Sequence, residues 1–329
     1  MSTRAAVQIV GAGPAGSAAA ITALGESAAV HISDRARTTR HKVCGEFLAA
    51  EACRVLDELG VWSEFLRRTP ARVHRCRLHF GSRMKEWRLA ETAFGLSRLA
   101  LDTLLLDRAA SLGATVSRGV PHSARTGDRV VLASGRNART AARPRLFGFK
   151  AHFAGPADDA VELFFTETGY VGISPVEGSL TNVCGLAPET ALRACGFELD
   201  DFLRRSQPLA DRLRPLSRQM NWLTTGPLIF SGPAADASEY RAGDALGFVD
   251  PFTGSGILHA LLTGRMAGAA AARGMPVTEY LHACRRLLAR PAAVSAAFRV
   301  ALRSGLAAHV ARLVPGPWMY RLTRAGYRA

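Results

Sequence analysis

Residues 7–16 read VQIVGAGPAG, a short hydrophobic strand followed at once by three glycines in the spacing G-x-G-x-x-G. In this setting Gly11 permits a tight turn, Gly13 lets a pyrophosphate approach the backbone, and Gly16 allows the next helix to pack closely on the strand. The alanine-rich stretch 15–24 is that helix, and its N-terminus offers unpaired N–H groups and a partial positive charge. The pattern predicts a dinucleotide-binding unit.

A second strand and an acidic residue follow at the distances that such a unit requires. Residues 28–33 form a mostly apolar run that ends at Asp34. This aspartate comes about 20 residues after the glycines, where its carboxylate can accept from a ribose 2′-hydroxyl. A glycine triplet alone is a weak signal, but strand, helix, strand and acid in the correct order strongly favour dinucleotide binding.

A second glycine-rich segment, residues 243–257, reads GDALGFVDPFTGSGI and opens another helix predicted over 257–271. A simple nicotinamide dehydrogenase has no need of such a segment. Here the chain resembles the FAD-dependent monooxygenases of the p-hydroxybenzoate hydroxylase type and, more closely, the geranylgeranyl reductase-like branch of that superfamily. The matching segments run in order along nearly the whole chain: 11–16, 34–35, 41–47 (HKVCGEF), 97–102 (SRLALD), 130–135 (VVLASG), 169–175 (GYVGISP) and 243–257.

The resemblance implies a non-covalently bound FAD, with NAD(P)H as the electron donor. It places the start of helix 257–271 at the pyrimidine edge of the flavin, Pro251 against the flavin ring, Asp244 at the ribityl chain and pyrophosphate, and Arg98 toward the FAD. Each assignment has an alternative. The turn 254–256 could be a plain helix start, Asp244 a capping aspartate and Arg98 part of a surface salt bridge. The cofactor-binding residues predicted in this way are Gly11, Gly13, Pro14, Ala15, Gly16, Asp34, Arg35, Lys42, Cys44, Gly45, Arg98, Val120, Gly243, Asp244, Pro251, Gly254, Ser255, Gly256 and Ile257.

We therefore predict an α/β fold. A Rossmann-like FAD-binding domain of the glutathione reductase and p-hydroxybenzoate hydroxylase type carries an inserted β-sheet substrate domain and a helical C-terminus. The FAD-binding domain is expected to be discontinuous. Its predicted segments are 1–70, 97–145 and 225–290, those of the substrate domain are 71–96 and 146–224, and the C-terminal helices take up 291–329.

Local patterns predict further elements outside the first βαβ unit. Residues 46–60 have the apolar spacing of a helix, 72–89 that of a β-hairpin, and strand-like runs between 146 and 186 suit the floor of a substrate site. Between Val116 and Val130 only about a dozen residues remain, where relatives carry an antiparallel meander over the adenine. We expect that meander to be reduced or absent, which would weaken the hold on FAD.

Three residues are predicted to take part in catalysis: Cys44, Lys150 and Tyr170. Cys44 lies in the loop KVCGE, which resembles a loop that passes near flavin and substrate in the reductase-like branch. A nearby Lys42 and a helix start at Glu46 would lower the pKa of its thiol. The alternative is a small buried hydrophobic side chain.

The other two candidates lie on strands of the expected floor. Lys150 and His152 alternate with apolar neighbours, so both face one side of a strand, either toward a phenolate or carboxylate or toward solvent. Tyr170 and Pro175 match the pattern Y-x-W-x-F-P of geranylgeranyl reductases, whereas glycine and serine replace its tryptophan and phenylalanine. Both tryptophans of the halogenase pattern W-x-W-x-I-P are missing, which counts against halogenation and predicts an open pocket.

The chain is strongly basic, with a formal charge of +15, and only three of its 42 basic residues are lysines. This balance reflects either codon bias or attraction to an anionic cofactor, an acidic carrier protein or a membrane surface. No nucleic-acid motif is present. The six cysteines show no zinc spacing, so we expect no metal, reduced thiols and a cytoplasmic location.

The chain ends are read in the same way. The first strand starts within about six residues of Met1, so no signal peptide is expected, and no apolar run is long enough to span a membrane. Residues 293–313 alternate apolar side chains with arginines. They form either an amphipathic helix pair that touches a membrane or helices packed on the protein's own core.

Three functions remain open from the sequence. The first is an NAD(P)H-dependent monooxygenase that hydroxylates an aromatic or polyketide-like hydrophobic small molecule. The second is an ene-reductase or dehydrogenase acting on an isoprenoid or lipid, and the third is a flavin-binding protein without turnover. The absence of a second G-x-G-x-x-G suits a nicotinamide nucleotide that binds only transiently.

Overall fold

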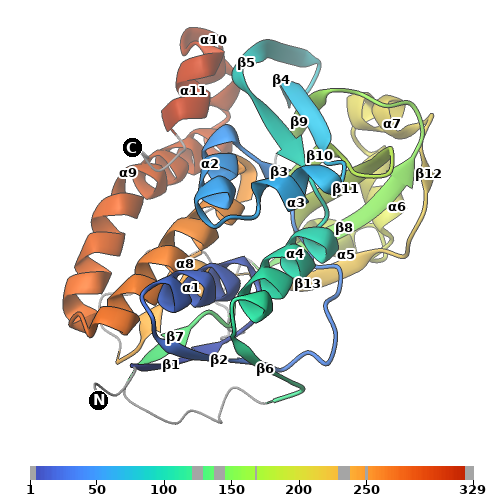
Figure 1. Cartoon of the computed structure of the whole chain (residues 1–329). Helices are drawn as coiled ribbons and strands as arrows, with labels where there is room; N and C mark the ends of the chain where they lie inside the picture. Colours follow the sequence, from blue (N-terminus) through green and yellow to red (C-terminus); the bar gives the residue numbers. More distant parts are fainter. Residues whose placement is uncertain are drawn as a thin grey trace.

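A computed structural model describes residues 5–120, 129–136, 145–166, 169–228, 238–248 and 251–322 of the chain. Within these residues the chain forms two β-sheets with helices packed beside and between them (Figure 1). The first sheet is the parallel sheet of the expected Rossmann-like unit. The second is larger and mixed, and it supplies the opposite wall of the site described below.

The first sheet has the strand order β14-β7-β1-β2-β6, and every neighbouring pair is parallel. Because the strands are parallel, their carboxyl ends meet at one edge, where α/β proteins bind ligands. The strands are β1 (Ala6–Val10), β2 (Ala29–Asp34), β6 (Thr115–Arg118), β7 (Val130–Leu132) and β14 (Tyr240–Arg241).

Helices α1 (Pro14–Gly25), α4 (Arg98–Ser111) and α8 (Gly256–Arg273) lie on one face of this sheet (Figure 1). Helices α1 and α8 pack almost backbone to backbone. A Cβ atom at Gly264 would lie 2.2 Å from the carbonyl oxygen of Ala15, and one at Gly268 would lie 2.1 Å from that of Ala19. Alanine and glycine are therefore required along this contact, which holds the N-terminus of α8 beside the glycine turn.

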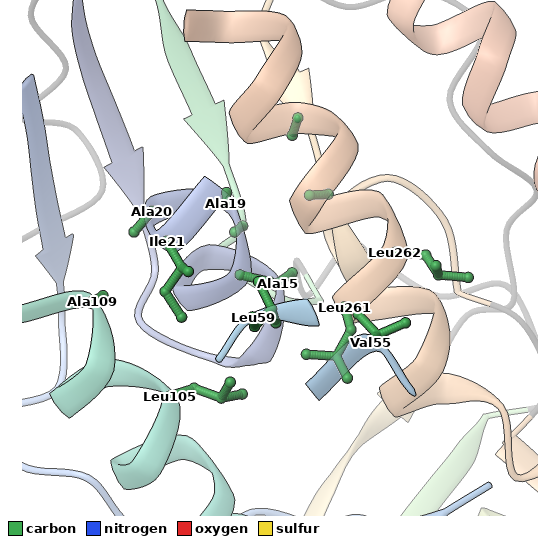
Figure 2. Packing of buried hydrophobic residues seen from close by; sticks show 14 of the residues in the cluster. Ala15, Ala19, Ala20, Ile21, Val55, Leu59, Leu105, Ala109, Leu261 and Leu262 are labelled. Atoms are coloured by element: carbon green, nitrogen blue, oxygen red, sulfur yellow. The ribbon is translucent and has the colours of Figure 1, made fainter. Parts of the chain in front are cut away.

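The core under these helices is built from small and branched apolar side chains (Figure 2). Ala15 of α1 lies close to Leu261 of α8, and Leu105 and Ala109 of α4 lie on the other side of α1. Helix α1 is buried nearly all round, which explains why its sequence is alanine-rich rather than amphipathic.

The second sheet has the order β12-β8-β11-β10-β9-β4-β5-β3, with β13 also paired to β8. Strands β4 and β9 are parallel, whereas the other paired strands are antiparallel. Its strands are β3 (Phe47–Leu48), β4 (Ala71–Phe80), β5 (Arg83–Gly95), β8 (Leu146–Ala154), β9 (Ala160–Phe165), β10 (Tyr170–Val176), β11 (Leu180–Pro188), β12 (Ser217–Arg218) and β13 (Leu223–Leu228).

Strand β8 has two contrasting faces. Phe149, Ala151 and Phe153 pack into an apolar cluster with the short helices α5 (Glu189–Arg193), α6 (Leu199–Arg204) and α7 (Gln207–Leu213). Lys150 and His152 point to the other face, and both are buried rather than exposed to solvent. The solvent-face alternative for these two residues is therefore wrong, because a second layer of protein covers that side of the sheet as well.

The predicted helix over 46–60 is wrong at its start. Glu46 has a φ of +55°, Phe47 and Leu48 form β3 against Gly95 and Phe94 of β5, and the helix α2 begins only at Ala50 (Ala50–Glu58). The cause is tertiary: the Glu46 side chain is held by the buried side chains of Lys150 and His152, described below. A further helix, α3 (Trp62–Arg67), follows.

The C-terminal region is helical, as the sequence predicts, with α9 (Val277–Arg303), α10 (Ala307–Leu313) and α11 (Gly316–Leu322). Phe298 and Leu302 of α9 pack against the aromatic cluster of the second sheet, so part of this region does cover the protein's own core. Among the described residues, no helix combines the length and the apolar character needed to cross a bilayer.

The question of the adenine-covering meander falls mostly on residues 121–128, which lie outside the described residues. The first sheet draws its strands from segments assigned above to the FAD-binding domain. The second draws them from 71–95 and 146–228, with the addition of β3. We retain the domain boundaries as a proposal on this basis.

Candidate functional site

A cavity of about 610 Å³ lies at the carboxyl edge of the first sheet and reaches the second sheet. The first sheet contributes residues at or just after the ends of β1, β2 and β7, including Gly13, Asp34 and Ser134. The second sheet contributes Tyr170 and Cys184. The cavity therefore joins the predicted dinucleotide turn to the expected substrate floor.

The glycine turn has the geometry that the sequence predicts. Gly11 has a φ of +108°, and its N–H donates to the carbonyl of Ser33 at 2.8 Å. A Cβ atom at Gly16 would lie 1.8 Å from the carbonyl oxygen of Gly11, so no side chain fits there. At Gly13 the space is open, and the nearest atoms to an added Cβ are Arg98 Nη2 at 3.7 Å and Lys42 Nζ at 3.9 Å.

These two cations are held in place by one buried carboxylate. Asp102, only 1% exposed, accepts from Lys42 Nζ at 2.7 Å and from Arg98 Nε and Nη2 at 2.7 and 2.9 Å. Burial alone would raise the pKa of Asp102, but the charges of Arg98 and Lys42 outweigh it and lower that pKa. Two positive charges against one negative charge leave a net positive charge beside Gly13, and the surface-salt-bridge alternative for Arg98 is wrong.

Asp34 closes the turn from the second strand. Its carboxylate accepts from the N–H of Ala12 at 3.1 Å and from that of Ala36 at 2.9 Å, and it lines the cavity. These bonds fix the carboxylate at the end of β2. Its contact with a ribose hydroxyl stays a prediction.

The N-terminus of α8 forms another wall. Gly254, Ser255, Gly256 and Ile257 line the cavity, and α8 has no acidic residue in its first turn and no side-chain cap. Its first N–H groups and the positive end of its dipole are therefore available to an anionic or electron-rich group.

Asp244 lies beside that wall in the short 3₁₀ helix η1 (Gly243–Ala245). It lines the cavity 3.6 Å from Arg136 Nε, and its side chain does not cap this helix, whose N-cap is Ala242. Pro251 opens the 3₁₀ helix η2 (Pro251–Thr253).

A buried charged cluster lies where the loop 41–46 meets β8. Glu46, fully buried, accepts at Oε1 from the ammonium of Lys150 and from the N–H of Arg98 at 2.6 Å. Its Oε2 lies 2.6 Å from His152 Nε2, and the ring of His41 meets that of His152 edge-on at 5.2 Å between centroids. We call Glu46, Lys150, His152 and His41 the proton cluster.

The electrostatics of the proton cluster favour a charged carboxylate. Burial would raise the pKa of Glu46, but the hydrogen bond from His152 and the charge of Lys150 outweigh it and lower that pKa. Burial, together with the positive charge of Lys150, lowers the pKa of His41. The two histidines and the glutamate could converge on a metal ion, but the ammonium of Lys150 on the same carboxylate opposes a cation there.

Glu46 and His41 both line the cavity, so the cluster is in contact with the site, whereas Lys150 lies behind Glu46. Sequence reasoning missed Glu46 and His41 as functional residues, although both belong to the matching segment 41–47. The only other indication in the sequence was the pair of polar residues on one face of a strand. It led to Lys150 and His152 but not to their partners Glu46 and His41.

Cys44 and Tyr170 also line the cavity. The carbonyl of Cys44 accepts from Asn182 Nδ2 at 3.0 Å, which fixes the loop against β11. Burial raises the pKa of the neighbouring Cys184 thiol to about 12, so that thiol stays neutral. The Tyr170 ring packs edge-on against Phe252 at 6.2 Å and forms part of an aromatic wall.

The residues present fit a dinucleotide. The open space at Gly13 faces two cations, the N-termini of α1 and α8 both border the cavity, and Ser134 Oγ is buried there without a partner among the described residues. Gly16 and Val120 do not line the cavity: Gly16 packs against Gly11, and the Val120 N–H donates to Asp34. The predicted residues that do line it are Gly11, Gly13, Pro14, Ala15, Asp34, Arg35, Lys42, Cys44, Gly45, Arg98, Gly243, Asp244, Gly254, Ser255, Gly256 and Ile257.

The fold and the cavity thus define the class of flavin-dependent oxidoreductases, and comparison with known proteins agrees. Residues 4–141 match the family described as FAD binding domain. The menaquinone reductase of Mycolicibacterium smegmatis is 30% identical over 88% of this chain and 81% of its own. The chain belongs to the FAD-dependent oxidoreductases of the p-hydroxybenzoate hydroxylase-like superfamily.

Solved structures share the fold at low identity. The flavin-dependent halogenase CmlS has a TM-score of 0.75 at 21% identity, over 100% of this chain and 69% of its own. A geranylgeranyl bacteriochlorophyll reductase-like protein from Thermoplasma acidophilum has a TM-score of 0.72 at 18% identity, over 97% and 93%. PqsL of P. aeruginosa, solved with 2-aminobenzoylacetate, has a TM-score of 0.73 at 16% identity, over 94% and 100%.

The buried carboxylate of Asp102 leads to a prediction about acid stability. Because its pKa is lowered in the folded state, its stabilising contribution is present above roughly pH 4 and is lost as the pH falls through the folded-state value. Asp102→Asn should cost about 3–5 kcal/mol of unfolding free energy at pH 7, since it leaves two cations uncompensated. Urea titrations at several pH values should show that this deficit shrinks in acid; a deficit independent of pH would contradict the prediction.

Proposed function

We propose that the protein is a FAD-dependent reductase that acts on an apolar, unsaturated small molecule of the quinone or isoprenoid lipid class. The observation that carries the proposal is the proton cluster, which borders the same cavity as the N-terminus of α8 and would supply the proton that must accompany hydride transfer. The sequence favoured a monooxygenase over this alternative. The reductase is now preferred because the 30% identical relative, matched over 88% of the chain, is a menaquinone reductase.

When bound, FAD would supply the hydride. The chain itself would hold the cofactor through Gly13, Arg98 and Lys42 at the phosphates, while the N–H groups at the start of α8 would stabilise negative charge on the flavin. The proton would be held between His152 Nε2 and Glu46 Oε2, with the ammonium of Lys150 keeping Glu46 ionised between turnovers. His41, half-buried at the cavity wall, would pass that proton to the substrate.

The apolar wall suits such a substrate. Tyr170, Leu186, Leu228 and Phe248 line the cavity. NAD(P)H is the proposed electron donor, and it would bind transiently, because the sequence has no second dinucleotide fingerprint.

Hydroxylation is the second candidate. What favours it is the sequence pattern, in which Gly172 and Ser174 replace the aromatic residues of the reductase pattern. Neither residue lines the cavity, so the pattern alone carries this candidate. A protein that only binds flavin is the weakest candidate, because such a protein has no need of a buried charged cluster at the cavity.

A two-arm experiment separates these functions. The FAD-loaded protein is reduced with NADPH or NADH without oxygen. It is then mixed either with a short-chain menaquinone in detergent, still without oxygen, or with oxygen and a phenol. A reductase should be reoxidised by the quinone without oxygen, and the product mass measured after exposure to air distinguishes a saturated side chain, which is stable, from a reduced ring, which reoxidises. Reoxidation only by oxygen, with an oxygen atom added to the phenol, would support the monooxygenase instead.

Replacement of Cys44 tests whether its thiol, in the cavity wall, takes part in the reaction. Cys44→Ser is nearly isosteric and leaves the bond from Asn182 to the Cys44 carbonyl in place, so FAD should stay bound. If the thiol takes part in proton transfer, turnover should fall about tenfold or more. Cys195→Ser, on the far side of the second sheet, is the control. Equal turnover in both variants would leave Cys44 with a packing role.

A further inference from the structure

The C-terminal helices expose large apolar side chains on their outer faces. Leu306, which directly precedes α10, is 55% exposed, and Leu313, the last residue of α10, is 82% exposed. Trp318 on α11 is 63% exposed. The inner faces of the same helices are buried: Ala307 and Ala311 are nearly inaccessible, as is Gly316, beside Trp87 of β5. These helices thus have a packed face, and Leu313 and Trp318 on them are exposed.

The β4–β5 hairpin extends this surface (Figure 1). Lys85 donates to the carbonyls of Ala311 and Val314, both at 2.6 Å, which fastens α10 to the hairpin. Met84, the neighbour of Lys85, is 56% exposed. We define the C-terminal surface as Met84, Leu306, Leu313 and Trp318 together with the exposed arginines Arg83, Arg312 and Arg321.

The charge of this surface has one sign. Residues 280–329 contain nine arginines and no aspartate or glutamate. Arg83, Arg312 and Arg321 form no ion pair with a residue that the structure describes, whereas Glu86 on the hairpin is bound to Arg77 and Arg75. Exposed leucines and a tryptophan, together with arginines that have no ion pair among the described residues, are the pattern of helices that lie in an anionic lipid interface.

The position of this surface agrees with a role in substrate supply. Phe298 and Leu302 of α9 pack into the same aromatic cluster as Tyr170 and Phe248, which line the cavity. Met319, the neighbour of Trp318 on α11, packs against the same cluster, so this cluster connects the C-terminal helices to the cavity wall.

We propose that the C-terminal surface docks the protein on the surface of an anionic lipid bilayer. The leucines and Trp318 enter the boundary between headgroups and acyl chains, and the arginines pair with lipid phosphates. The link to an apolar substrate rests on the proposed function, whereas the lipid binding itself does not.

Cosedimentation of the full-length, FAD-loaded protein with vesicles tests the proposal. Vesicles of phosphatidylcholine and phosphatidylglycerol should bind the protein at low salt, pure phosphatidylcholine vesicles should bind it weakly, and high salt should release it. Leu313→Ser with Trp318→Ser should weaken binding about tenfold or more. Arg312→Gln with Arg321→Gln should weaken it about fivefold for each arginine.

Matched controls alter the same residue types elsewhere. Phe197→Ser removes an apolar side chain that is 55% exposed near α5, and Arg193→Gln with Arg204→Gln removes the same charge from α5 and α6. Both should leave binding unchanged. Full-length protein that stays in the supernatant, or controls that weaken binding as much as the C-terminal variants, would overturn the proposal. So would an acidic carrier protein that occupies this surface and excludes vesicles.

The readouts keep the two proposals apart. Vesicle binding is measured without substrate, and reduction of a short-chain quinone is measured in detergent without vesicles. If the C-terminal variants lose vesicle binding yet reduce the detergent-dissolved quinone normally, the docking proposal is supported. Failure of quinone reduction in every variant and in the wild type would count against the proposed function alone.

Discussion

A valine in place of Gly13 is expected to give a folded but colourless protein. A Cβ atom at this position meets only the ends of Arg98 and Lys42, at 3.7 and 3.9 Å, so the fold can accept the new side chain. The same side chain would fill the space in which the pyrophosphate has to approach the backbone. FAD content, measured by absorbance after denaturing the purified protein, should fall to near zero, while the thermal transition of the FAD-free protein should stay close to that of FAD-free wild type.

Two further glycine variants serve as controls for Gly13→Val. Gly25→Val, at the other end of α1, introduces the same side chain into open space and should keep the protein yellow. Gly16→Val should prevent folding, because its Cβ would lie 1.8 Å from the carbonyl oxygen of Gly11. A fully loaded Gly13→Val protein would show that the cofactor does not lie over this turn.

The second large effect is expected from Glu46→Gln. Glutamine keeps the shape of the side chain but cannot balance the charge of Lys150 or accept a proton from His152. Turnover should fall about a hundredfold or more, with FAD still bound, and the protein should lose about 3–5 kcal/mol of unfolding free energy. Steady-state rates with NADH or NADPH measure the effect on turnover, and urea titrations measure the effect on unfolding free energy.

Glu162→Gln is the matched control for this variant. Glu162 is also buried, only 2% exposed, and accepts from Arg212 at 2.6 Å and lies 3.3 Å from His79, but it does not line the cavity. Its loss should cost similar stability and leave turnover nearly unchanged. Lys150→Met, which removes the cation and keeps Glu46, should also reduce turnover. Equal rates in the Glu46 and Glu162 variants would remove the proton cluster from the mechanism.

The sequence predicted most of the regular structure, because those elements are encoded by local patterns. The strand, turn and helix at 6–25 and the strands between 146 and 188 fall close to where apolar periodicity and glycine placement put them. The hairpin was predicted over 72–89, and its second strand continues to Gly95. The error at Glu46 has the opposite cause. The apolar residues downstream of Glu46 have helical spacing, but Lys150 and His152, more than a hundred residues away along the chain, hold its side chain, and Phe47 and Leu48 pair with the second sheet.

The cofactor-binding residues could be predicted from the sequence, because the backbone geometry of the site requires particular residue types at these positions. A turn that binds phosphate needs glycine at fixed spacing, and a helix that presents its N-terminus needs a glycine-rich turn before it. Such requirements appear in the sequence as glycines at fixed spacing within a few neighbouring positions. Arg98 and Lys42 came from the resemblance, but their common partner Asp102 was identified only in the folded chain.

The sequence by itself therefore determined the FAD-binding class, the parallel sheet and the turn that faces the phosphates. Only the tertiary structure decided that Lys150 and His152 face Glu46 rather than solvent, and that His41 joins them at the cavity. It also decided which arginines and leucines of the C-terminal helices remain outside. The reason is physical: a turn is specified by the residues next to it, whereas the burial and pairing of a charged side chain depend on segments that meet it only after the chain has folded.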